Sequence, residues 1–510
     1  FAFGEAAEHY RVLLDLPASV TGLDRTDLRE KLADACSGSG DPASALELYE
    51  QLARETPEAP PLQRARWLRK AGTCHNELGQ LVEAHECLLR GLSRLGVRPG
   101  GGLSVAYKLL AVLVPTLGTL TYPRDRDRAR EIQALCLRLV HVQFFLRPPG
   151  WVMQALDFTL HQLLATMAVG EYDPSPQTRF TLGHLCLHGP RLFRPLAPGF
   201  LRRAARLADR LEDTPVKALV LRQTGYLLHE SGLPREASLV AHRAEALSDR
   251  LGDVLGLAET YLILGTIYAY WGRLERAEHY SRKALETSQS CGSRTTEALA
   301  VSDLAHAAYL RGDPVSARRW FEDLQSRQAA PFLCMITELV RAWIQLLEGQ
   351  PAAALETVEA NARRCEELGG GPFYARLLRH QKASALLARA EAGDDRETSL
   401  GAAELCIRDM ISDVFLLFVG RARALRARAR LLRGDRAGAL KDYREADALF
   451  ERLDSPLEQG RVQLALAGLE ADPAHRVRAG QLLGEAGVPP EDLQGASNWV
   501  RETLHEGSVG

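Results

Sequence analysis

The chain has 510 residues, 46% of them hydrophobic and 25% charged, and its formal net charge is −2. This composition is typical of a globular protein and excludes a disordered chain. The balance of 63 basic and 65 acidic residues excludes a general attraction to nucleic acid or to an anionic membrane, and no apolar run reaches the length of a membrane span.

The nine cysteines are scattered singly along the chain, and none forms a C-x-x-C pair. An odd, dispersed set of this kind indicates buried thiols in a reducing compartment, so we expect a cytoplasmic protein. The chain begins at Phe1 rather than at Met, and its opening FGEAAEHYRVLL is typical of the second helix of a hairpin. We therefore expect a piece of a longer protein.

Residues 258–285 predict two helices joined by a tight turn at Gly272. The first helix carries the spacing Tyr-x2-Leu-Gly-x2-Tyr, and Ala277 follows the turn glycine by five residues. Gly265 and Ala277 fall where the two helices of such a hairpin cross, and small residues there let the backbones approach closely. The pattern resembles the tetratricopeptide repeat, with Tyr261 where Trp is usual.

The same register recurs at seven predicted turns. The turn glycines are Gly40, Gly79, Gly232, Gly272, Gly312, Gly349 and Gly434. Seven residues before each lies a small residue: Ala33, Gly72, Gly225, Gly265, Ala305, Ala342 and Ala427. Five residues after each lies an alanine: Ala45, Ala84, Ala237, Ala277, Ala317, Ala354 and Ala439. Neighbouring turns are 39, 40, 40 and 37 residues apart, longer than the usual period of about 34.

This register divides the chain into four regions. Residues 1–95 are expected to form N-terminal hairpins, the first of them incomplete, and residues 96–215 irregular helical repeats. Residues 216–453 form the regular array with a period near 40, and residues 454–510 form C-terminal capping helices and a tail. Strand signals are nearly absent. The expected fold is therefore all-α: a tetratricopeptide-like solenoid of helical hairpins wound into a right-handed superhelix.

Outside the register, apolar periodicity and breaks at Gly and Pro predict further helices. These cover residues 103–120, a segment ending at Phe145, and residues 151–169, 177–187, 198–211, 457–469, 476–484 and 490–504. Gly252, Gly292 and Gly369 are predicted to end their helices in the left-handed conformation.

The array resembles the long-period tetratricopeptide arms of bacterial multidomain signalling proteins, in which the arm follows an AAA/STAND-type ATPase. The resemblance rests on the register, on the segment HVQFFLRPPG and the residues after it, and on the opening FAFGEAAEHYRVLLDL. Such proteins also carry a kinase, a cyclase or a DNA-binding domain. The resemblance implies an arm that senses a partner or peptide and controls an upstream ATPase or effector, its own ATPase domain being one possible partner. Ser281, where an aromatic residue is common, departs from the family pattern.

No catalytic motif stands out: the chain has no G-x-x-x-x-G-K-[ST] loop, no H-R-D or D-F-G, and no nucleophile elbow. We expect a non-catalytic protein–protein interaction and regulatory arm, without cofactor or metal. One alternative is a fragment of a multidomain enzyme, an ATP-dependent kinase or cyclase regulator, whose catalytic part lies outside this chain. Another is binding of an acidic partner or nucleic acid through the Arg-rich helix 421–436. That reading is disfavoured because neighbouring carboxylates are expected to pair with the arginines and no aromatic residues are interleaved for base stacking.

The first helices of such arrays line a concave surface, and their positions two, five, nine, twelve and thirteen point into it. Here these positions combine aromatic rings with Arg and His, which suits a peptide-binding lining. The candidate partner-binding groove comprises Arg222, Tyr226, His229, Glu259, Tyr270, His306, Tyr309 and Trp343. From the sequence alone, packing inside a tightly wound superhelix explains these side chains equally well.

His184 and His188 lie four residues apart on a predicted helix, a spacing compatible with a metal site. Cys186 would point to the other side of that helix, and no Glu completes an H-E-x-x-H pattern. A packing or surface role is therefore favoured.

Overall fold

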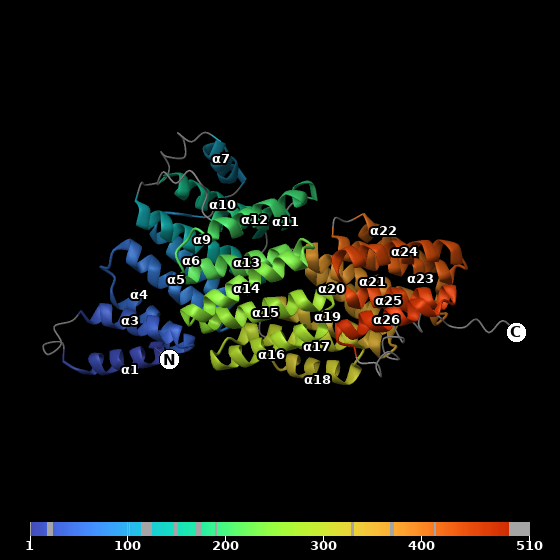
Figure 1. Ribbon diagram of the computed structural model, residues 1–510. Coiled ribbons are helices and arrows are strands. Elements are labelled where there is room, and N and C mark those ends of the chain that lie inside the picture. Colours follow the sequence, from blue (N-terminus) through green and yellow to red (C-terminus); the bar gives the residue numbers. More distant parts are fainter. Residues whose placement is uncertain are drawn as a thin grey trace.

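A computed structural model describes residues 2–17, 24–98, 100, 102–113, 125–146, 151–168, 176–188, 191–327, 331–367, 372–412 and 415–488. Within these residues every regular element is a helix (Figure 1), which confirms the predicted all-α solenoid. The first half comprises α1 (Ala2–Asp15), α3 (Arg25–Gly38), α4 (Pro42–Glu55), α5 (Pro61–Glu77), α6 (Leu81–Arg94), α7 (Gly102–Leu113), α9 (Arg126–Leu146), α10 (Trp151–Ala168), α11 (Pro176–His188), the 3₁₀ helix η1 (Arg191–Leu196), α12 (Ala197–Ala208), α13 (Pro215–Glu230) and α14 (Pro234–Leu251). The second half comprises α15 (Val254–Trp271), α16 (Leu274–Ser290), α17 (Arg294–Arg311), α18 (Pro314–Gln325), α19 (Pro331–Leu347), α20 (Pro351–Glu367), α21 (Pro372–Glu391), α22 (Arg396–Ile411), α23 (Leu416–Leu432), α24 (Arg436–Leu453), α25 (Pro456–Glu470) and α26 (Pro473–Ala486).

The seven turn glycines all adopt the positive φ that the register requires. Gly272, for example, has φ 81° at the end of α15, a conformation in which a Cβ is unfavourable. The predicted C-caps at Gly252 and Gly292 are confirmed, with φ 63° and 68°. Gly369 lies outside the described residues.

The helix crossings are as tight as the small residues predict. Ala277 is 1% exposed and packs in the α15–α16 hairpin. A Cβ on Gly265 would lie 2.4 Å from Ser281 Oγ and 3.2 Å from the Ser281 backbone nitrogen. Ser281 itself is fully buried, so the small serine at this position accommodates the close approach of the two helices.

Acidic N-caps explain where several helices begin. Asp253 Oδ1 accepts the Gly256 N–H at 2.9 Å ahead of α15. Asp313 Oδ1 accepts the N–H groups of Val315 and Ser316 at 3.1 and 3.0 Å ahead of α18. These bonds satisfy N–H groups that would otherwise have no partner in the first turn.

Most predicted helices outside the register are present. The segments at 151–169, 177–187, 198–211, 457–469 and 476–484 correspond to α10, α11, α12, α25 and α26, and α9 ends at Leu146, one residue past Phe145. Helix α7 ends at Leu113, and the rest of the predicted helix at 103–120 lies outside the described residues. The segment predicted at 490–504 also lies outside them.

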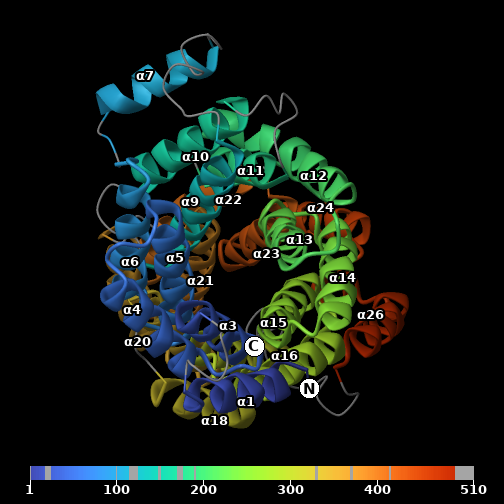
Figure 2. The same cartoon turned by 90° about the vertical axis from the view of Figure 1, so that its left-hand side faces the viewer.

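The solenoid turns back on itself, as the end-on view in Figure 2 shows. The α3–α4 turn meets the α16–α17 turn so closely that a Cβ on Gly40 would lie 2.9 Å from the Cys291 Cα. At the other end the α24–α25 turn packs on the α15–α16 turn: Trp271 Nε1 donates to the Leu453 carbonyl at 3.1 Å, and Ser455 Oγ donates to the Trp271 carbonyl at 3.2 Å. These contacts join segments more than 180 residues apart in sequence.

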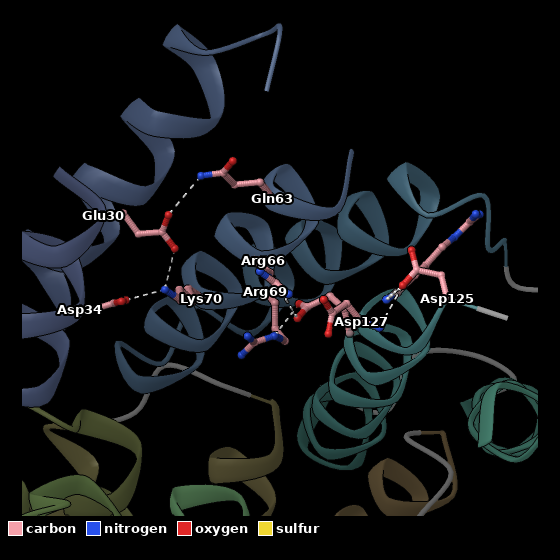
Figure 3. Close-up of polar contacts among 10 residues, drawn as sticks. Glu30, Asp34, Gln63, Arg66, Arg69, Lys70, Asp125 and Asp127 are labelled. Carbon is pink, nitrogen blue, oxygen red and sulfur yellow. Dashed lines mark hydrogen bonds and ion pairs between the residues drawn. The ribbon is translucent and has the colours of Figure 1, made fainter. Parts of the chain in front are cut away.

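Polar side chains connect α5 to α3 and to α9 (Figure 3). Lys70 Nζ on α5 lies 2.9 Å from Glu30 Oε1 and 2.6 Å from Asp34 Oδ1, both on α3. Arg69 Nε, also on α5, donates to Glu131 Oε1 on α9 at 2.6 Å. Helix α5 is thereby held between α3 and α9. Its C-terminal end is directed towards the inside of the superhelix.

None of the described helices is long and apolar enough to cross a lipid bilayer. All nine cysteines are free thiols, six of them buried.

Candidate functional site: a cavity inside the superhelix

A large cavity lies inside the described part of the solenoid. It is lined by residues of α5, α9, α11, α13, α15, α17, α19 and α21. The non-atom space in and around it, open solvent included, is about 1590 Å³, and the part that the centres of water-sized molecules can occupy is about 160 Å³. One water needs roughly 10–15 Å³ of the volume that the centres of water-sized molecules can occupy. The cavity therefore has room for on the order of ten waters or one small organic molecule.

The cavity follows helix α17. Its lining from this helix includes Thr295, Leu299, Ser302, Asp303 and His306. These residues recur every three or four positions and therefore share one face of the helix. At 1.5 Å per residue they extend along roughly 16 Å of the cavity wall.

An aromatic ladder forms one end of the cavity. The ring of His306 on α17 lies 4.8 Å from that of Tyr270 on α15 and 4.1 Å from that of Trp343 on α19, the latter pair stacked. Tyr309 stacks on Trp343 at 5.4 Å behind them. Burial, with some repulsion from Arg421 and Arg461, holds the pKa of His306 well below its usual range, so this imidazole is neutral and acts as an aromatic ring.

One helical turn from the ladder lies a polar pair. Thr266 on α15 donates its hydroxyl to Asp303 Oδ2 on α17 at 2.6 Å. Burial raises the pKa of Asp303 to about 7, although the Thr266 hydrogen bond lowers it. Among the described residues, no Lys, Arg or His forms an ion pair with this carboxyl group.

Charged groups gather towards the other end. Arg222 on α13 forms an ion pair with Glu259 on α15. Burial raises the pKa of Glu259, but Arg222, His141 and Arg138 outweigh burial and leave the pKa below its usual value. Glu77, at the end of α5, is 7% exposed, and its pKa rises to about 8 because burial outweighs the attraction of Arg138.

Helix α21 closes the cavity from the opposite side of the superhelix. The hydroxyl oxygens of Tyr374 on α21 and Tyr226 on α13 lie 3.5 Å apart. The ring of Phe373 contacts Tyr270 edge-on at 5.2 Å and His229 at 5.6 Å. The lining thus combines helices of the middle of the chain, such as α13 and α15, with the later helix α21.

The structure brings the eight predicted groove residues to this region. Five line the cavity directly: Tyr226, Glu259, Tyr270, His306 and Trp343. Arg222 forms an ion pair with the lining residue Glu259, and Tyr309 stacks on the lining residue Trp343. His229 is 2% exposed and lies between Tyr270 and Phe373, where burial lowers its pKa to about 4.

Several lining residues were not among the predicted ones. Glu77, Arg138 and His141 come from α5 and α9, and Phe373 and Tyr374 from α21. No local signal in the sequence indicates that these helices face the same space as α15 and α17. Asp303 lies on the same face of α17 as the predicted His306 and could have been found by its charge.

The two other candidate sites have different surroundings. His184 lines the cavity and lies 6.2 Å from the Phe180 ring, while the side chain of His188 lies outside the described part. The structure, where described, holds no group of three or more His, Cys, Asp or Glu side chains placed to bind a metal.

The Arg-rich helix α23 is neutralised by carboxylates of adjacent helices, as expected. Arg421 Nε donates to Glu458 Oε1 at 2.8 Å, and Arg426 Nε donates to Asp442 Oδ2 at 2.8 Å. The other pairs are Arg423 with Glu445, Arg428 with Glu391, Arg430 with Asp442, and Arg433 with Glu397 and Glu404. This pairing leaves little free positive charge for an acidic partner on α23.

Comparison with known proteins identifies a tetratricopeptide repeat at residues 258–291, which cover most of α15 and all of α16. No curated protein is significantly similar to the chain in sequence. Among solved structures, yeast Tom70 aligns with a TM-score of 0.34 at 14% identity, covering 94% of this chain and 95% of its own. The APC/C hetero-tetramer Cut9–Hcn1 gives 0.34 at 16% identity, covering 99% and 93%. The human IFIT1 dimer with m7Gppp-AAAA gives 0.27 at 13%, covering 98% and 94%. At TM-scores below 0.5, none of these alignments carries an inference about the ligands of this chain.

The chain is therefore a tetratricopeptide-like solenoid of helical hairpins, consistent with a protein–protein interaction scaffold.

Proposed function

We propose that the chain is a non-catalytic regulatory arm that senses a ligand held inside its superhelix. The observation that carries this proposal is the central cavity, whose wall combines aromatic and aliphatic side chains with a few buried polar groups. Ligand sites in proteins have this composition. The limited volume of the cavity favours an occupant no larger than a short peptide over a folded partner domain.

The arrangement of the wall also suggests how occupancy is signalled. The cavity wall contains helices from α5 to α21, so a ligand contacts elements that are far apart in the sequence. A ligand that binds the closed form better than an open one shifts the population towards the closed form. A partner that recognises the outer surface then distinguishes the two forms.

Filling the cavity tests the proposal. Leu299 lines the cavity on α17, and Leu299→Trp would occupy ligand space. Leu239 on α14 is 63% exposed and does not line the cavity, so Leu239→Trp is the matched control. We expect aromatic fragments of about ten heavy atoms to bind the wild type and Leu239→Trp but not Leu299→Trp. Ligand-observed NMR measures this binding. Equal binding to all three proteins would place the fragments elsewhere and refute the proposal.

We propose in addition that the arm acts on an ATPase or another signalling effector in the cytoplasm, its own ATPase domain included. The long period of the repeats and the resemblance to arms of AAA/STAND-type ATPases support this, and the free thiols suit a reducing compartment. The gene region encoding the residues before Phe1 tests it. A phosphate-binding loop of the form G-x-x-x-x-G-K-[ST] in that region supports a fused ATPase, and a start codon directly before Phe1 contradicts it.

A further inference from the structure

Two carboxyl groups in the cavity wall have no cationic side chain paired with them. Asp303 accepts a hydrogen bond from Thr266 at 2.6 Å, and Glu77 is 7% exposed. Neither forms an ion pair within 4.0 Å among the described residues, whereas the third carboxyl group of the lining, that of Glu259, is paired with Arg222. Glu77 is still attracted by the nearby Arg138, whereas Asp303, which is partly buried, has no such neighbour among the described residues. Withdrawing a carboxylate from water without a counter-charge is costly, so the Asp303 site favours the arrival of a positive charge.

The aromatic ladder provides the second half of such a site. Tyr270, His306 and Trp343 line the cavity, and Asp303 precedes His306 by three residues, or about 4.5 Å along the helix axis. The guanidinium of Arg421 already lies 6.0 Å over the Tyr270 ring, and His306 stacks on Trp343. The rings therefore offer a wall for the body of a ligand beside the carboxylate, and the carboxylate is the partner for its charge. Leu262, Leu299 and Ile336 supply apolar surface next to these groups.

We propose that the cavity binds a small organic cation, with its ammonium group at Asp303 and its apolar or aromatic body against Tyr270, His306 and Trp343. This inference rests on the proposed function and specifies the chemistry of the ligand. An anionic ligand is disfavoured because it would approach Glu77 and Asp303. The only Arg in the lining, Arg138, lies at the opposite end, near Glu77 and Glu259.

The direct test compares three probes of one shape and three charges: 3-phenylpropan-1-amine, 3-phenylpropan-1-ol and 3-phenylpropanoate. Dissociation constants for the full chain are measured by ligand-observed NMR titration at pH 8. The proposal predicts that the amine binds at least tenfold more tightly than the alcohol and that the carboxylate binds most weakly. Equal affinity of amine and alcohol would overturn it, as would tighter binding of the carboxylate.

Asp303→Asn removes the charge and nearly keeps the shape. The amine should lose at least tenfold in affinity for this variant, while the alcohol binds as before. The control is Glu297→Gln on the same helix, because Glu297 pairs with Arg327 and does not line the cavity. Unchanged binding of the amine to Asp303→Asn refutes the assignment of the ammonium site. Circular dichroism melting of each variant confirms that it is folded.

A pH series provides a second measurement on the same proteins. Ionised Asp303 is needed to hold the cation, so affinity for the amine should rise between pH 6 and 8 in the wild type and change less in Asp303→Asn. Tyr270 on α15 and His306 on α17 do not titrate in this window, since burial raises the pKa of the first and lowers that of the second.

The other groups of the wall are Glu77 on α5, Arg138 and His141 on α9, His184 on α11 and Glu259 on α15. Any titration of these groups contributes to both proteins and cancels in the comparison. Identical pH profiles for the wild type and Asp303→Asn would overturn the proposal.

The outcomes separate this inference from the proposed function. If all three probes bind equally and Leu299→Trp blocks them, the cavity is a ligand site but not one for cations. If none of the probes binds at millimolar concentration, the cation proposal fails, and the fragment test with Leu299→Trp then decides the proposed function by itself.

Discussion

The hydroxyl oxygens of Tyr226 and Tyr374 lie 3.5 Å apart although 148 positions separate the two residues in the sequence. Tyr226 belongs to α13 and Tyr374 to α21, two helices that are far apart in the chain. The pair thus joins two walls of the central cavity, and it reports directly on whether the superhelix is closed.

Tyr226→Phe and Tyr374→Phe should each lower the free energy of unfolding by about 0.5–1.5 kcal/mol, because each leaves a buried hydrogen-bonding group with fewer partners. The double variant should cost less than the sum of the single ones, since both remove the same contact. Urea unfolding measures all three. Tyr261→Phe, on the partly buried outer side of α15, serves as the control. Strict additivity of the two changes would show that the hydroxyl groups do not interact.

The helix crossings provide a matched pair of variants. Ala354 on α20 is fully buried at the position equivalent to Ala277, and Ala352, two residues earlier, is exposed. Ala354→Leu should overpack the α19–α20 crossing and cost roughly 1–3 kcal/mol. Ala352→Leu should change stability by less than about 0.5 kcal/mol. Thermal or urea unfolding decides, and equal effects would mean that Ala354 does not lie at a crossing.

Closure of the C-terminal end depends on Trp271. Its Nε1 donates to the Leu453 carbonyl, so Trp271→Phe should cost about 1 kcal/mol or more and loosen the turn before α25. Hydrogen–deuterium exchange should become faster in α25 and α26 and stay unchanged in α3 and α4. Trp320→Phe on α18 removes an indole that does not contact the closing turn. Faster exchange in α25 with Trp320→Phe as well would point to a general loss of stability instead.

The pKa of Asp303 predicts a pH-dependent stability. The folded state raises this pKa from 3.8 to about 7, so it binds an extra proton relative to the unfolded chain between these values. The free energy of unfolding should therefore fall as pH rises through that window and level off above pH 7.

Asp303→Asn should lack this decline. Its stability relative to the wild type should increase from pH 5 to pH 8 by on the order of 2 kcal/mol, measured by urea unfolding. Other titrating groups contribute equally to both proteins. Parallel profiles would contradict the raised pKa.

The repeat architecture could be predicted from the sequence because its signals are local. Turn glycines, crossing alanines and N-cap aspartates each act within one hairpin, so their spacing determines the hairpin at Gly272 without reference to the rest of the chain. The concave positions followed from the same register, which is why Tyr270 and His306 were found.

The cavity itself could not be predicted in this way. It exists because α5 lies against α17 and α9 lies against α19, and these contacts depend on the accumulated angle between many successive hairpins. A small change in that angle at each hairpin would leave the same residues on an open groove. Glu77 and Tyr374 therefore line the cavity because of the course of the whole chain and not because of a local sequence pattern.

The closing contact between Trp271 and Leu453 changes what kind of unfolding this repeat protein should show. In an open array each repeat touches only its neighbours, so the ends can fray while the middle stays folded. Here the last hairpins contact the α15–α16 hairpin in the middle of the chain through Leu453 and Trp271. The early hairpins contact the end of the same hairpin through Gly40 and Cys291. Fraying at either end then removes support from the centre. The solenoid should consequently melt as one unit, and shortened versions of it should lose more stability than the number of removed repeats would suggest.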